Sequence, residues 1–75
     1  MNKNLLYSKI ELKGMQINEF LEEVNNEGVK LSKSAFYSRI KEKQQFDAKQ
    51  IKAIVKVLKL TKEDMNDIFF KELVS

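Results

Sequence analysis

Apolar residues recur along the chain at spacings of three and four residues, which is the period of an amphipathic α-helix. Five segments carry such a stripe. Their apolar positions are Leu5, Leu6 and Ile10; Ile17, Phe20, Leu21 and Val24; Ala35, Phe36 and Ile40; Ile51, Ile54, Val55 and Leu58; and Met65, Ile68 and Phe69. The pattern predicts an all-α fold, with five short helices packed around one core.

The residues beside each stripe predict where the helices begin and end. The first helix is expected from about Asn4 to Lys13, before Gly14, and the second from about Ile17 to Asn25. Ser32 is a favourable N-cap for a third helix that reaches Lys41. Two pairs have the spacing of a capping box and predict the starts of the fourth and fifth helices: Asp47 with Gln50, and Thr61 with Asp64.

The second and third helices are separated by a segment that contains turn residues. Residues 25–28 read Asn-Asn-Glu-Gly, and Gly28 can adopt a positive φ at little cost. Val29 and Leu31 are apolar and are expected to point inward from this connection. Two short helices joined in this way and flanked by supporting helices are the sequence form of a helix-turn-helix.

The composition limits the function classes. No cysteine or histidine occurs among the 75 residues, so disulfides and the commonest zinc ligands are absent, and packing alone must stabilise a single domain spanning residues 1–75. Without these residues or a glycine-rich phosphate loop, neither an enzyme nor a cofactor, metal or small-molecule substrate is expected. No apolar run is long enough for a signal peptide or a membrane span, so we expect a cytoplasmic protein.

Positive charge is concentrated in the middle of the chain. Residues 28–59 contain nine cationic and two acidic side chains, a net charge of +7, whereas residues 1–27 and 60–75 each have a net charge of −2. This distribution is typical of a protein that docks one face on a polyanion, although a solvated lysine surface would give the same count. A basic helix lying on a membrane is disfavoured, because the core needs its apolar face.

The outward side of the third helix carries hydroxyls, an aromatic ring and cations, with no acidic residue among them. Early positions of a recognition helix reach base edges, so base readout is predicted at Lys33, Ser34 and Ser38. Phosphate contacts are predicted at a wider set of positions. These are Ser32, Tyr37, Arg39, Lys41, Lys43 and Lys49.

Several of these positions have a second interpretation. Ser32 can be a cap and nothing else, and Tyr37 can rest its ring on the bundle. Arg39 can instead form an ion pair within the protein. Lys56 and Lys59 continue the basic ridge that begins at Lys49 and are interpreted as solvated side chains.

From Ile10 to Phe70 the chain resembles the phage Cro and repressor family of helix-turn-helix proteins, in particular a small branch from Gram-positive phages and chromosomes. The matching stretches are Lys13-Gly14-Met15, residues 20–24 (FLEEV), residues 31–40 (LSKSAFYSRI), Phe46, and residues 51–70. The resemblance implies a recognition helix over Ser32–Ile40. It also implies a transcriptional repressor that binds a two-fold operator in double-stranded DNA as a homodimer, with recognition helices about 34 Å apart.

Two departures from the family pattern concern docking. Gln16 and Ile17 stand where the family usually has a capping Thr and a phosphate-binding Gln. The Asn25–Leu31 connection is several residues longer than the family's tight turn.

The apolar residues near the C-terminus exceed what the core needs, so the dimer interface is predicted at Phe70, Leu73 and Val74, and core burial at Phe69. The competing interpretation is a protein-binding adaptor or anti-repressor that reuses the fold.

Overall fold

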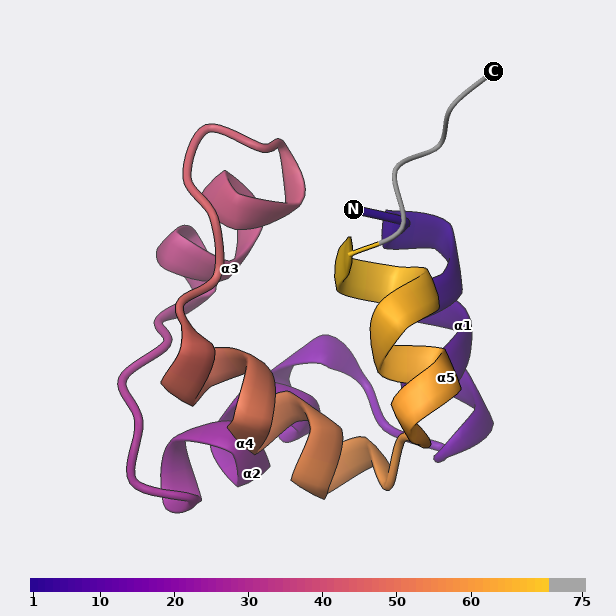
Figure 1. The fold of residues 1–75 in the computed structure, drawn as a ribbon. Helices are drawn as coiled ribbons and strands as arrows, with labels where there is room; N and C mark the ends of the chain where they lie inside the picture. Colours follow the sequence, from indigo (N-terminus) through magenta and orange to yellow (C-terminus); the bar gives the residue numbers. More distant parts are fainter. Residues whose placement is uncertain (71–75) are drawn as a thin grey trace.

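A computed structural model describes residues 1–70, which form five helices and contain no strand (Figure 1). The helices are α1 (Lys3–Leu12), α2 (Ile17–Asn26), α3 (Lys33–Ile40), α4 (Ala48–Leu58) and α5 (Lys62–Met65), and α5 continues as a π-helical segment, η1 (Asn66–Phe70). The predicted all-α fold is therefore confirmed, and the predicted boundaries of the first three helices and the predicted start of the fourth agree to within about one residue.

Side-chain caps explain where most of the helices begin. Each accepts a hydrogen bond from a backbone N–H three residues later, which satisfies a donor that has no partner within the helix. The caps are Asn2 for α1, Ser32 for α3, Asp47 for α4 and Thr61 for α5, with donor–acceptor distances of 2.7–3.1 Å. At the start of α2 the Glu19 carboxylate instead accepts from the Gln16 backbone N–H, at 3.0 Å.

Left-handed residues mark the ends of the helices. Gly14 and Gly28 have positive φ values of 71° and 96°, as predicted. Two residues that are not glycine do the same, Glu42 with φ 62° and Lys59 with φ 52°. After α3, Glu42 N donates to the Arg39 carbonyl and Lys43 N to the Ser38 carbonyl, which is the Schellman pattern that ends a helix.

The core lies between α4 packed on α2 and α1 packed beside η1. Phe36 of α3 is fully buried at its centre. The rings that surround Phe36, with centroids 5.4–6.4 Å away, belong to Tyr7, Phe20, Tyr37 and Phe46. Such aromatic packing gives α3 a large apolar anchor in the bundle.

Burial follows the predicted stripes with a few additions. Leu31 is buried and Val29 packs against the core, as expected for the connection, whereas Leu60, Ala53 and Gln50 are buried without having been predicted. Phe69 is half-buried, and Phe70 lies outside the core with 59 % of its surface exposed. None of the helices within residues 1–70 has the length and apolar character needed to cross a membrane.

Candidate nucleic-acid interface

The outer face of α3 is accessible along its length. Lys33, Ser34 and Lys41 are exposed, and Tyr37 and Ser38 are half-buried. The opposite face is anchored by Phe36 and Ile40, both buried. The helix therefore presents the residues predicted to read bases on the side away from the core.

Two of the three predicted base-reading residues lie at the N-terminal end of α3. Lys33 and Ser34 are in the first turn, and Ser38 is one turn further along the same side. The Ser32 hydroxyl oxygen accepts from Ala35 N at 3.1 Å, so its capping role is confirmed. The hydroxyl proton of Ser32 is not used in that bond and can still be donated.

Tyr37 lies with its ring against the bundle. Its ring meets that of Phe36 at a centroid distance of 5.4 Å and an interplanar angle of 68°, which confirms the packing interpretation. Burial raises the pKa of the nearby Tyr7 hydroxyl, and the proximity of Tyr37 raises it further. The two phenols lie near each other, one on α1 and one on α3.

Arg39 does not point straight into solvent. Its Nε–H donates to Gln50 Oε1 at 3.0 Å, and Nη1 donates to the Ala35 carbonyl at 3.2 Å. No carboxylate within residues 1–70 lies within 4.0 Å of it, so the alternative of an ion pair is wrong for the described chain. The guanidinium is held by neutral groups, and within residues 1–70 part of its donor set has no hydrogen-bond acceptor.

Gln50 is the one buried polar side chain in the described part of the chain, with 5 % of its surface exposed. Its Oε1 also accepts from Asp47 N at 3.1 Å, which completes the predicted capping box, and its Nε2 donates to the Lys30 carbonyl at 3.2 Å. Gln50 thus joins α3, α4 and the connection before α3. The spacing of Asp47 and Gln50 predicted only the capping role. The hydrogen bonds to Arg39 and Lys30 depend on how the helices pack, and the sequence around Gln50 does not indicate them.

The connection between α2 and α3 is tied across its base. The Asn25 side chain donates to the Leu31 carbonyl at 2.9 Å and accepts from Leu31 N at 2.9 Å. The same amide donates to the Leu21 carbonyl at 2.6 Å. Both ends of the segment are thereby fixed; between them residues 26–28 and Lys30 are exposed, while Leu31 stays in the core.

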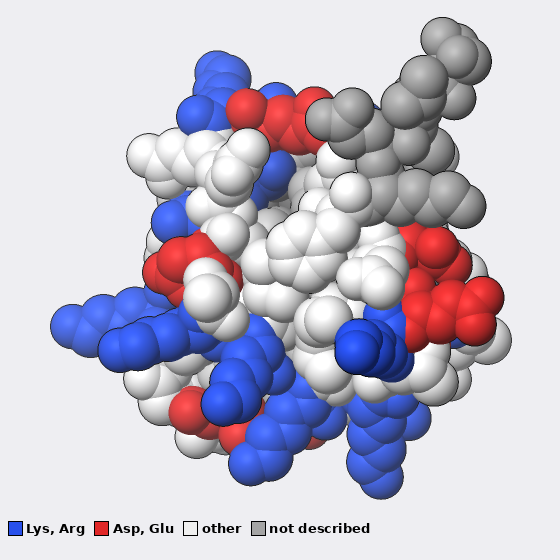
Figure 2. Space-filling view, in the orientation of Figure 1, with Lys and Arg blue, Asp and Glu red and all other residues white. Residues whose placement is uncertain are grey.

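Lysines follow one side of α4, at positions 49, 52, 56 and 59. In the view of the molecule in Figure 2, basic side chains gather over the lower part of the surface, where Figure 1 shows α4. Lys56 pairs with Glu27 at 3.0 Å, and it is the only one of the four with an acidic partner within 4.0 Å among the described residues. Lys49, in the first turn of α4, and Lys41 and Lys43, after α3, are exposed as phosphate contacts require.

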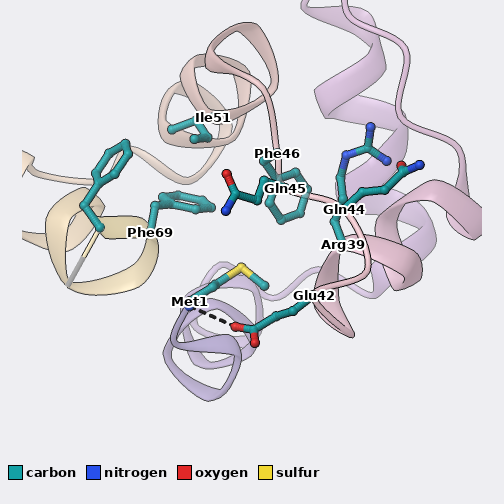
Figure 3. A pocket seen from close by; sticks show the side chains of 9 residues that line it. Met1, Arg39, Glu42, Gln44, Gln45, Phe46, Ile51 and Phe69 are labelled. Atoms are coloured by element: carbon teal, nitrogen blue, oxygen red, sulfur yellow. Dashed lines mark hydrogen bonds and ion pairs between the residues drawn. The ribbon is translucent and has the colours of Figure 1, made fainter. Parts of the chain in front are cut away.

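A groove of about 470 Å³ lies between the 39–46 segment and η1. Figure 3 shows the side chains of Met1, Phe46 and Phe69 pointing toward one another in it. At its edge the Met1 ammonium pairs with Glu42 at 3.0 Å. Of the predicted dimer residues, Phe70 lines this groove, whereas Leu73 and Val74 lie outside the described residues.

Comparisons of the chain with protein-family models, with curated proteins and with solved structures found no match. The functional interpretation therefore depends on the residues and geometry of the chain itself.

Proposed function

We propose that the chain is a sequence-specific DNA-binding regulator, a repressor that acts as a homodimer on a two-fold operator, with α3 in the major groove. The observation that carries this proposal is the outer face of α3. It exposes Lys33 and Ser34 at its N-terminal end, carries no acidic residue, and is backed by the buried Phe36. A major groove about 12 Å wide admits a helix of this kind and offers acceptors to such donors.

The surroundings of α3 support docking on a duplex. Lys41 and Lys43 follow its C-terminal end, and Lys49 lies in the first turn of the next helix. These exposed cations would contact phosphates on either side of the groove and fix the register of α3. Tyr37 packs against the core and Ser32 caps α3, and each also retains a hydroxyl proton that it would donate to a phosphate oxygen.

The mechanism is steric in this proposal. A dimer covering an operator excludes polymerase, with no ligand required. Phe70 supplies the self-contact, because a large exposed aromatic side chain, at a groove that Phe46 and Phe69 also line, is typical of an interface. The dimer would place two copies of α3 about one turn of DNA apart, roughly 34 Å.

The test is selection from a random duplex library at about 0.15 M salt, where exposed charges are already well screened. Enrichment of a two-fold motif is expected. Binding without any motif, or no binding, would contradict the proposal and favour an adaptor that uses the same basic face on an acidic protein.

A further inference from the structure

We infer that Gln50 is a positioning residue for DNA recognition, whose buried amide fixes the direction of α3 relative to α4. This inference rests on the proposed function. The amide oxygen accepts from Arg39 Nε and from Asp47 N, and the amide nitrogen donates to the Lys30 carbonyl. With both acceptor sites of the oxygen filled, the amide has one favourable orientation, since rotating it by 180° would set its NH₂ group against two N–H donors.

The partners of Gln50 hold both ends of α3. Lys30 comes two residues before the Ser32 cap, and Arg39 is in the last turn of the helix. Arg39 is itself fixed by the Ala35 carbonyl one turn earlier. A single side chain on α4 is therefore bonded both to the segment that leads into α3 and to the last turn of α3, which fixes how the helix is rotated about its axis.

Apolar packing alone would set this direction less sharply. The buried side chains of Phe36 and Ile40 anchor α3 to the core. The hydrophobic effect is non-directional, however, and tolerates small rotations of the helix about its axis. Hydrogen bonds weaken steeply with angle, and a buried amide that loses its partners is costly. Base contacts need their side chains held to within about 0.5 Å and 10–20°, which is the accuracy that the Gln50 bridge would add.

The experiment compares the wild-type protein with Gln50→Met, which keeps the length of the side chain and removes its hydrogen bonds. Affinity is measured for the duplex selected by the wild-type protein and for a scrambled duplex of equal length. We expect the ratio of the two affinities to fall by about tenfold or more, as for the loss of one good base contact. Binding to the scrambled duplex is expected to stay within about twofold, because phosphate contacts carry it.

Two further variants separate positioning from stability. Ile54→Val thins the core on the same helix without touching the bridge, so it should lower the melting temperature and leave the affinity ratio unchanged. Gln50→Glu keeps acceptors for Arg39 and Asp47 but cannot donate to Lys30, so its ratio should fall between those of the wild type and Gln50→Met.

A double-mutant comparison with Lys33→Ala tests the positioning role through the affinity ratio, independently of any change in the free energy of unfolding. Lys33→Ala should reduce the affinity ratio less in the Gln50→Met protein than in the wild type, because the misdirected helix has already lost the contact. An unchanged ratio in Gln50→Met, or additive effects of the two substitutions, would overturn the inference and leave the proposed function intact. A wild-type protein that does not distinguish the two duplexes would contradict both.

Discussion

Two single residues, Glu42 and Lys59, adopt a conformation that is costly for a side chain with a Cβ atom. Both lie in the left-handed region at the end of a helix, where glycine is the favoured residue. After α4, Lys59 N donates to the Lys56 carbonyl and Leu60 N to the Val55 carbonyl, so the turn is held by backbone bonds that any residue can make. The lysine side chain at position 59 is exposed and contributes strain there rather than packing.

Lys59→Gly should therefore stabilise the protein by up to about 1 kcal/mol, because relief of the left-handed strain exceeds the entropy that glycine adds to the unfolded chain. Urea denaturation followed by circular dichroism measures the change. Lys52→Gly, in the interior of the same helix, is the matched control and should lose roughly 0.5–1 kcal/mol. A loss of stability at both positions would contradict the argument.

Asp64 links pH to stability at the start of α5. The Thr61 backbone N–H donates to its carboxylate and holds the pKa of Asp64 below its usual value, with smaller contributions from the Thr61 side chain and from Lys9 at 3.3 Å. Because the folded pKa is lower than the unfolded one, the stabilisation is complete above the unfolded value of about 3.9 and is lost as pH falls through the folded pKa.

Asp64→Asn should flatten the decline in unfolding free energy as pH falls below about 5, since the titrating group is gone. Denaturation at a series of pH values would show this. Glu63→Gln removes the same charge from the neighbouring exposed position and should leave the slope closer to that of the wild type. Identical slopes for the wild type and Asp64→Asn would count against the assigned linkage.

At the level of helices, the spacing of apolar residues and the capping residues were enough to predict where most of the helices lie. Ser32, Asp47 and Thr61 begin helices because capping chemistry is local and visible in the sequence. Contacts between helices were not visible in this way. The bonds from Gln50 to Arg39 and Lys30 join residues 11 and 20 positions apart, and nothing in local spacing indicates them.

The π-helical end of the last helix shows the same limit. The stripe of Met65, Ile68 and Phe69 predicted a helix, but not that its backbone widens over Asn66–Phe70. In this segment Asn2 N donates to the Ile68 carbonyl at 2.7 Å, so the helix end is tied to the start of α1. This hydrogen bond joins the two ends of the described chain, so it depends on the tertiary fold and not on the local sequence.

The two ends of α3 should respond differently to loss of a lysine. Lys33→Ala should reduce the preference for one base pair by about 1–3 kcal/mol, because its contact would be to a base edge. Lys43→Ala should weaken binding to all duplexes alike, because its contact would be to phosphate. Competition binding with single-base operator variants distinguishes the two, and equal behaviour would contradict these roles.

Phe36 should be the most sensitive core position of α3. Phe36→Ala removes the ring that four other aromatic residues contact, and should cost about 3–5 kcal/mol. Leu12→Ala is the comparison, since Leu12 is 77 % exposed and its loss should change stability by no more than about 0.5 kcal/mol. Similar losses in thermal melts of the two variants would show that the core is not centred on α3.

At the scale of the whole molecule, the lysines of α4 lie apart from the groove beside Phe70, but Arg39 lines that groove, and Lys41 and Lys43 belong to the segment that forms its other side. The lysines of α4 occupy the lower part of the face in Figure 2, whereas Phe70 and the groove belong to η1 and the 39–46 segment. A dimer that forms through Phe70 must therefore leave the side chains of Lys41 and Lys43 uncovered if it is to bind DNA as proposed.

Phe70→Glu should convert the proposed dimer to a monomer with little change in the melting temperature of the monomer, since this side chain is 59 % exposed. Sedimentation velocity over a range of protein concentrations measures the state. Asn66→Glu places the same charge on an exposed position of η1 and should leave the dimer intact. A monomeric wild-type protein at high concentration would rule out the self-contact.

The amide clasp between Asn25 and Leu31 fixes both ends of the intervening segment, in which Glu27 pairs with Lys56 and Val29 packs against the core. Lengthening a loop whose ends are already held costs little, about 0.6 kcal/mol for each doubling. Residues inserted between Glu27 and Gly28 would extend outward before the chain reaches Lys30, where the Gln50 bond begins. This position would therefore accept a reporter group, and related chains could vary in length here without reorienting α3.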